Sequence, residues 1–102
     1  MFKINANPTF EATLTIVGQG REQKLNLSLR HKTKSQYAEL FKGLQEGNST
    51  PVDVILELVE KWDADTEFSR TSLEQLQEQQ PGADWAIITG YGEALVVARK
   101  GN

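Results

Sequence analysis

The sequence predicts an α+β domain in which an N-terminal antiparallel β-hairpin packs on a mostly α-helical C-terminal part of about four helices. Apolar residues alternate with polar residues over 9–30, a period that is typical of half-buried strands. Over 34–100 the apolar residues recur at helical spacing instead. The length of 102 residues, with 38% apolar and 25% charged residues, fits a single soluble domain over 1–102 with one core.

The hairpin is expected over 9–30 because two alternating stretches flank a segment that contains glycine. This segment, "GQGRE", can adopt the positive φ values that tight hairpin turns require. An isolated hairpin is marginally stable in water, so we expect its apolar face to pack on the helical part. The alternating apolar residues are Phe10, Ala12, Leu14, Ile16, Leu25, Leu27 and Leu29.

Three helices are expected to begin at residues that can cap a helix N-terminus. The first, in "KSQYAELFKGLQEG", can be capped by Thr33 or Ser35. The second, in "STPVDVILELVEKW", has Thr50 as its cap and a proline next to it, and its apolar stripe continues to Trp62. The third, in "FSRTSLEQL", has Ser69 as its cap.

The last segment, "ADWAIITGYGEALVVARK", is expected to form a fourth helix. Two glycines interrupt it, and each costs about 1 kcal/mol in the middle of a helix. The stretches "AIIT" and "ALVVA" are therefore alternative strands. A helix is favoured because Trp85, Ile88, Gly92 and Leu95 form one stripe that the core would bury.

The segment "EKWDADTEFSRTSLE" matches the ligand spacing of a calcium-binding EF-hand loop. The sixth position of such a loop is a glycine because the backbone turns sharply there, but this chain has Phe68. The eighth position is normally apolar and is Arg70 here. We therefore expect no calcium site. The residues at the ligand positions are Asp63, Asp65, Glu67, Ser69, Thr71 and Glu74.

No residue pattern in the chain indicates catalysis, a cofactor or a bound metal. The chain has no cysteine and a single histidine, His31, so thiolate chemistry is excluded and a metal centre or catalytic triad would have to be built around one imidazole. No nucleophile elbow, phosphate-binding loop or dinucleotide fingerprint is present. No apolar run is long enough for a signal peptide or a membrane span.

Two groups of side chains are candidates for contact with a partner. The basic cluster Arg30, His31, Lys32 and Lys34 would suit a phosphate or an acidic partner, but the net charge of −3 favours a solvated surface over nucleic-acid binding. The second group consists of aromatic residues near helix ends, which can line an apolar groove for an amphipathic helix. These are Trp62, Phe68, Trp85 and Tyr91.

The whole chain resembles the small tail assembly chaperones of long-tailed bacteriophages and prophages. The matching stretches are "MFKINANPTFEATLTI", "LSLRHKTKSQYAEL", "ILELVEKWD" followed by "FS", and "PGADWAIITGYGEALVVARKGN". Their order and spacing carry the resemblance. Two positions depart from the family pattern: Gln80 replaces an aromatic residue before "PGA", and Lys100 replaces a leucine before the final "GN".

The resemblance implies a non-catalytic protein of the host bacterial cytoplasm, acting in infected or lysogenic cells. Such chaperones hold the long, helix-rich tape measure protein, recruit tail tube subunits and leave before the tail is complete. Self-association is left open. Two other functions also stay open: a minor phage structural protein that remains in the virion, and a nucleic-acid-binding module that uses the basic cluster.

Overall fold

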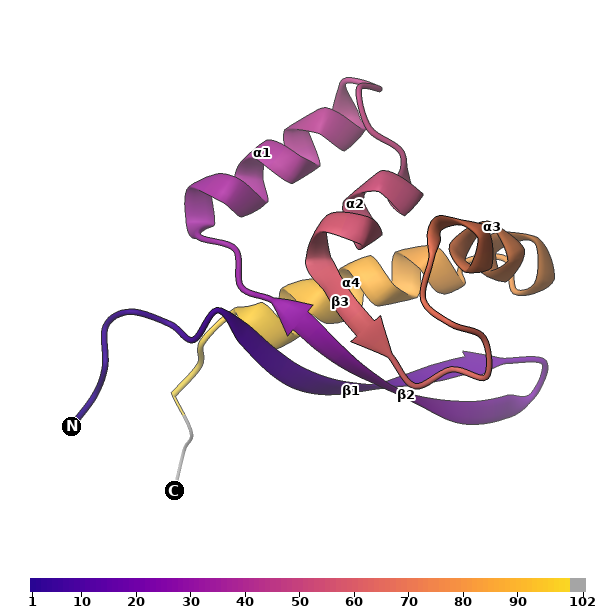
Figure 1. Cartoon of the computed structure of the whole chain (residues 1–102), viewed down its shortest axis with the longest axis horizontal. Helices are drawn as coiled ribbons and strands as arrows, with labels where there is room; N and C mark the ends of the chain where they lie inside the picture. The colour runs from indigo at the N-terminus through magenta and orange to yellow at the C-terminus, as the bar shows by residue number, and fades with distance from the viewer. Residues whose placement is uncertain (100–102) are drawn as a thin grey trace.

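The computed structural model describes residues 1–99 and consists of a three-stranded sheet with four helices on one side of it. The predicted α+β class, with a hairpin packed on a helical part, is confirmed (Figure 1). The predicted helical part ends at residue 100, and that residue and the final "GN" of the family pattern lie outside the described residues. The elements are β1 (Thr9–Gly18), β2 (Arg21–Arg30), α1 (Lys34–Gln45), α2 (Pro51–Leu58), β3 (Val59–Trp62), α3 (Arg70–Gln79) and α4 (Ala83–Leu95).

The predicted hairpin is confirmed with its expected boundaries. Strands β1 and β2 pair antiparallel in an unbroken register from Thr9 opposite Arg30 to Gly18 opposite Arg21. The two residues of the turn, Gln19 and Gly20, have φ values of 53° and 75°. Both lie in the left-handed region, as a two-residue hairpin turn requires when its twist matches that of the strands.

A third strand, which the helical spacing of the sequence does not predict, follows α2. The helix predicted over "STPVDVILELVEKW" ends at Leu58, and the residues that follow form β3, which pairs antiparallel with β2. Val59 is buried and Trp62 half-buried, whereas Glu60 and Lys61 between them are exposed. The free edge of β2 offers backbone hydrogen bonds that a lone hairpin leaves unpaired, and this pairing overrides the helical spacing. The sheet order is β1-β2-β3.

The predicted helix starts are confirmed. Thr33, Thr50 and Ser69 each accept a hydrogen bond from the backbone N–H three residues later, and each makes a reciprocal capping box. The segment "ADWAIITGYGEAL" is helical, so the alternative strand "AIIT" is wrong. The predicted helix over "ADWAIITGYGEALVVARK" is too long, because α4 ends at Leu95, and residues 96–99 form neither a helix nor the alternative strand "ALVVA". Thr33, rather than Ser35, is the cap of α1.

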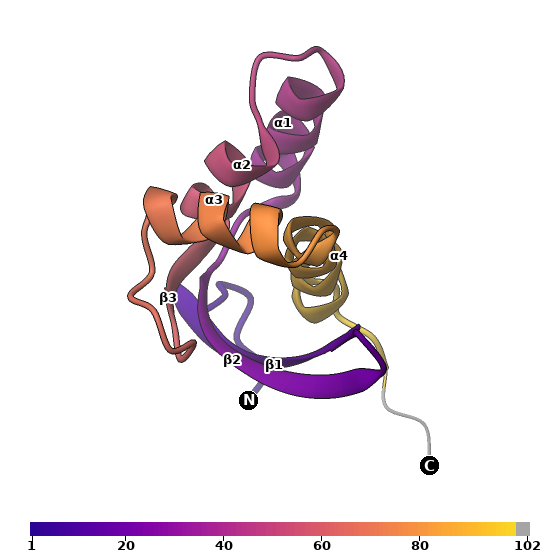
Figure 2. The same cartoon turned by 90° about the vertical axis from the view of Figure 1, so that its right-hand side faces the viewer.

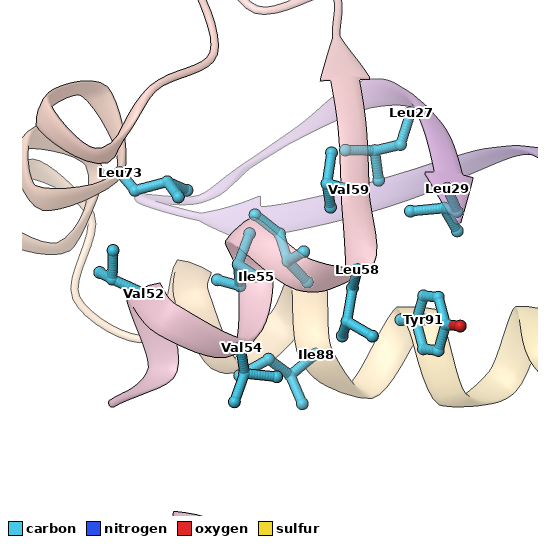
Figure 3. Close-up of a cluster of buried hydrophobic side chains, with 11 residues drawn as sticks. Leu27, Leu29, Val52, Val54, Ile55, Leu58, Val59, Leu73, Ile88 and Tyr91 are labelled. Carbon is cyan, nitrogen blue, oxygen red and sulfur yellow. The ribbon is translucent and has the colours of Figure 1, made fainter. Parts of the chain in front are cut away.

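The core lies between the sheet and the helices (Figure 3). The inner face of the sheet supplies Leu27 and Leu29, and the opposite face is exposed along β1 and polar apart from Val17. Figure 2 shows the helices gathered on one side of the curved sheet. The fully buried side chains from the helices and β3 include Ile55, Leu58, Val59, Leu73, Ile87, Ile88 and Tyr91.

The buried face of α4 differs from the predicted stripe. Ile88 is buried as expected and Leu95 is half-buried, but Trp85 is 49% exposed and Tyr91 is fully buried. The stripe through Trp85 is wrong because α4 packs against α2, α3 and β1 at once, so its contacts spread beyond one narrow seam. The buried residues of α4 are Ala83, Asp84, Ile87, Ile88 and Tyr91.

The two glycines in α4 are explained by close packing. A Cβ atom at Gly90 would lie 2.6 Å from a methyl carbon of Leu14, and one at Gly92 would lie 2.5 Å from the hydroxyl of Tyr37. The absence of side chains at these two positions lets α4 approach both β1 and α1. This approach offsets the cost of about 1 kcal/mol per glycine in a helix.

We predict that Gly92→Ala destabilises the protein by about 1–2 kcal/mol, because displacing Tyr37 outweighs the gain in helix propensity. Tyr37→Phe removes the hydroxyl and leaves the next ring atom 3.6 Å from the new methyl group, an ordinary contact. In the Tyr37→Phe background, Gly92→Ala should therefore be neutral or stabilising. Urea unfolding of the four proteins measures this coupling, and equal effects of Gly92→Ala in both backgrounds would contradict it.

A second prediction concerns acid unfolding. Hydrogen bonds from Thr50 and from the Arg70 guanidinium lower the pKa of Asp53 to about 2. Because this pKa is lower in the folded state, the stability from ionised Asp53 is complete above about pH 4 and is lost as the pH falls to 2. Asp53→Asn should flatten the pH dependence of the unfolding free energy in that range. Arg70→Met should have a smaller effect, and an unchanged slope in Asp53→Asn would refute the assignment.

Candidate functional site

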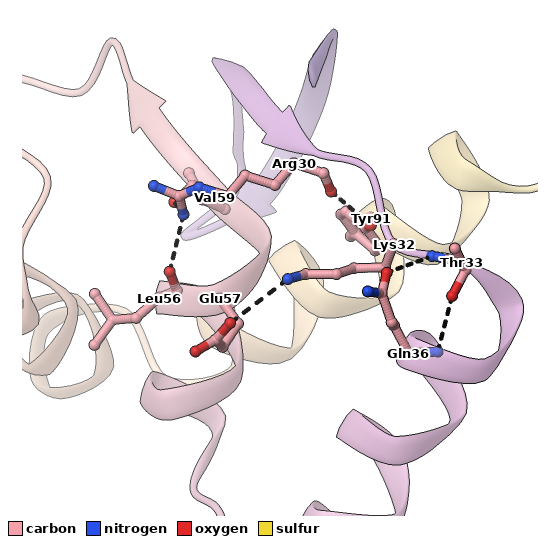
Figure 4. A network of polar contacts seen from close by, with 8 residues as sticks. All are labelled: Arg30, Lys32, Thr33, Gln36, Leu56, Glu57, Val59 and Tyr91. Carbon is pink, nitrogen blue, oxygen red and sulfur yellow. Dashed lines mark hydrogen bonds and ion pairs between the residues drawn. The ribbon is translucent and has the colours of Figure 1, made fainter. Parts of the chain in front are cut away.

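The predicted basic cluster is largely committed to internal contacts (Figure 4). The Nη1 atom of Arg30 donates to the carbonyl oxygens of Leu56 at 3.1 Å and Val59 at 2.8 Å. Lys32 forms an ion pair with Glu57, with Nζ and Oε2 3.5 Å apart. These bonds close the junction between α2 and β3, which argues against a basic surface for nucleic acid. Lys34 is exposed at the first position of α1.

Tyr91 is a core residue. It is 0% exposed, and its hydroxyl donates to the backbone oxygen of Arg30 at 2.8 Å. Its ring lies near the rings of Phe10 and Tyr37, with centroid distances of 6.0 and 5.8 Å. Burial raises the pKa of Tyr91 to about 12. The predicted role of Tyr91 at a partner surface is therefore wrong, because its side chain does not reach the surface.

Trp62 and Phe68 pack on each other and close the loop between β3 and α3. Their rings meet edge to face with centroids 5.1 Å apart, and the indole N–H of Trp62 donates to the oxygen of Thr66 at 2.6 Å. Both residues are half-buried. They hold this loop in place, and the structure does not bring them together with Trp85 in one groove.

The acidic loop uses its side chains to hold the fold. The carboxylate of Asp63 accepts hydrogen bonds from the backbone N–H of Asn26 at 2.9 Å and from its amide nitrogen at 2.6 Å. These bonds lower the pKa of Asp63. Ser69 caps α3, so two of the calcium-spaced residues have separate structural partners. Within residues 1–99, no three acidic, histidine or cysteine side chains form a group that could hold a metal ion.

Trp85 lines a hollow between β1 and α4, which we name the β1–α4 groove. It has a volume of about 720 Å³. Strand β1 contributes apolar side chains to the groove, and α4 contributes small residues that leave room beside the exposed indole of Trp85. The residues that line the groove include Leu14, Ile16, Trp85, Ala86, Gly90 and Glu93.

The groove runs along the open edge of the sheet, because β1 is an edge strand. Both backbone groups of Asn26 bond to Asp63 and thus point toward β3, away from β1. In an antiparallel pair, its partner Thr13 must then direct its own N–H and C=O to the open edge. The same alternation applies at Thr9, Glu11, Thr15 and Val17, which leaves a row of backbone donors and acceptors without strand partners.

Trp85 is one of the residues predicted from the sequence to contact a partner, but the β1–α4 groove beside it is not predicted from the sequence. Alternation along β1 predicts its inward face, and this includes Leu14 and Ile16. It does not predict that α4 lies against that strand. The feature of the sequence that points to a groove is the pair of small residues Ala86 and Gly90. Small side chains on a helix either let a neighbouring element approach closely or leave a hollow beside it.

Within the described residues, none of the helices has the length and apolar character needed to cross a bilayer. A family model described as "Phage tail assembly chaperone" matches residues 1–102, the whole chain. Comparison with curated proteins and with solved structures yields no match.

We predict that Arg30→Met destabilises the protein by about 1–3 kcal/mol, because it removes a charged donor from the carbonyls of Leu56 and Val59. Arg30→Lys should recover part of this loss, since an ammonium can still donate. Lys34→Met is the matched control on the surface and should stay within about 0.5 kcal/mol of the native protein. Thermal unfolding of the three variants tests this order. Equal effects at the two positions would show that Arg30 has no internal role.

Proposed function

The chain belongs to the phage tail assembly chaperone family, and we propose that it is a non-enzymatic chaperone that binds tape measure protein, tail tube subunits or both during tail assembly. We place its action in the cytoplasm of an infected or lysogenic bacterium. Membership of the family supports the general role. The clients and the location are our proposals.

The observation that carries the proposal is the exposed indole of Trp85 beside the β1–α4 groove. Tryptophan is enriched among residues that dominate binding energy, because it offers a large rigid surface. Here it lies next to a hollow whose walls include Leu14 and Ile16. A client side chain that enters the groove would bury apolar area on both partners.

This arrangement suits a client with long apolar surfaces. By family resemblance, the tape measure protein is a long, helix-rich chain, and its apolar stripes would aggregate before the tail tube encloses them. One groove of this size gives a weak contact, but many copies on one client give strong total binding. Each copy can still be displaced when tube subunits polymerise along the client.

We predict that Trp85→Ala reduces the recovery of the cognate tape measure protein at least tenfold when the two proteins are co-expressed and purified through a tag on the chaperone. The reason is the loss of the largest exposed apolar side chain at the groove. Because Trp85 lies outside the core, the thermal unfolding temperature should change little. The same assay with the tail tube protein shows which client the groove serves.

Val97→Ser is the matched control, since Val97 is 88% exposed and does not line the groove. It should leave recovery of the client unchanged. Failure of the native protein to co-purify with either client, or to raise the client's soluble yield, would overturn the proposal. Mass spectrometry of purified virions is the second test: a chaperone should be absent, whereas a minor structural protein would remain.

A further inference from the structure

The N-terminal arm, which we define as residues 1–8, carries exposed apolar side chains in an alternating pattern. Phe2 is 85% exposed and Ile4 is 90% exposed, and the polar residues Lys3 and Asn5 alternate with them. Figure 1 shows the arm leaving the sheet and running away from the body of the molecule. A segment with this pattern has the period of a strand and lacks a surface to cover its apolar side.

The open edge of β1 has few of the common protections against strand pairing. Edge strands usually carry lysine, proline or a bulge, which block the approach of another strand. Strand β1 is ten residues long and pairs with β2 without a bulge. Its sequence, "TFEATLTIVG", contains a single charged residue, Glu11. Such an edge is a template for a further strand.

We propose that the N-terminal arm of a second copy of this chain adds to the open edge of β1 as a fourth strand. The backbone groups that Thr13 and its alternate neighbours direct to the edge would then be paired. Phe2 and Ile4 would face the β1–α4 groove, where Leu14 and Trp85 can cover them. An extended arm of this length spans about 25 Å, close to the length of the edge from Thr9 to Val17.

The charges of the two surfaces are complementary. Lys3 is the single charged side chain of the arm, and Glu11 is the single charged side chain of β1. When Phe2 and Ile4 face the groove, Lys3 lies on the opposite face of the sheet, which is also the face of Glu11. The groove itself contains a second carboxylate, Glu93, and no basic residue. A basic arm is therefore attracted to this edge.

The arm must come from another copy because its own path leads away from the edge. The backbone oxygen of Pro8 accepts a hydrogen bond from His31 N–H at 2.8 Å, so the pairing between β1 and β2 continues through residue 8. A return of the arm onto its own edge would need a reversal of the chain directly after Pro8, which this bond opposes. The arm instead bends at Pro8, Ile4 and Asn5 and runs away from the body of the molecule (Figure 1). Each copy thus offers one arm and one open edge. When the arm of each copy binds the edge of the next, the copies associate head to tail and form a ring or a short filament.

The chain contains no cysteine, which permits a direct cross-linking test on the full-length protein. Asn5→Cys in one tagged copy should form a disulfide with Thr13→Cys or Thr15→Cys in a differently tagged copy, since all three positions share one face of the proposed sheet. Lys61→Cys, on β3 at the other edge of the sheet, is the matched control. We expect at least tenfold more heterodimer with one of the β1 partners than with Lys61→Cys. Equal yields would overturn the proposal.

Sedimentation of the purified chain alone gives a second measurement. The average mass should rise with concentration, and the double variant Phe2→Ser/Ile4→Ser should remain monomeric, whereas Val96→Ser/Val97→Ser should behave as the native chain. Lys3→Glu or Glu11→Lys should weaken association, and the two changes together should restore it. A native chain that stays monomeric at all concentrations would refute the proposal. No client is present in these experiments, so their outcome is independent of client binding.

Discussion

The hydrogen bonds of Arg30 connect β2 to α2, β3 and α4, and the rest of the structure depends on these connections. Its guanidinium binds the last turn of α2 and the first residue of β3, and its backbone oxygen accepts the hydroxyl of Tyr91 from α4. One residue at the end of β2 therefore ties together the sheet, the helix-to-strand junction and the central helix. Arg30 donates hydrogen bonds to carbonyl oxygens at the end of α2, which the helix itself leaves unpaired. The chain can therefore leave the helix there and turn into β3, which completes the sheet.

The sequence predicted the elements whose causes are local. The hairpin follows from alternation and a turn that needs positive φ, and the helix starts follow from Thr33, Thr50 and Ser69. Strand β3 was missed because its cause is not local. Val59 and Trp62 continue the helical spacing of α2, and only the free edge of β2, more than 25 residues earlier in the chain, makes a strand the better structure.

The residues that could contact a partner were also predicted only in part, because their exposure does not depend on local sequence alone. Aromatic residues at helix ends can be listed from the sequence, but packing decides which of them are exposed. Tyr91 is buried beside β1, α1 and the end of β2. Trp62 and Phe68 pack on each other, and Trp85 stays exposed. Periodicity alone places Trp85 and Ile88 on one stripe. The actual stripe is set by how closely α4 approaches β1 and α1, and Gly90 and Gly92 determine that distance.

An open sheet edge and an exposed apolar arm would each be a liability in a protein that acts alone. Any strand can form backbone hydrogen bonds with an open edge, so these bonds do not select a partner. In the proposed contact, selectivity comes from the apolar side chains Phe2 and Ile4 and from the charge pair of Lys3 with Glu11. Such a contact is small and therefore reversible. If the arm of one copy covers the groove of another, each copy protects the surface that its client needs, and a client that buries more apolar area can displace the arm. Reversible self-association and client binding are then two uses of one groove, and their competition makes association of the chaperone decrease as client becomes available.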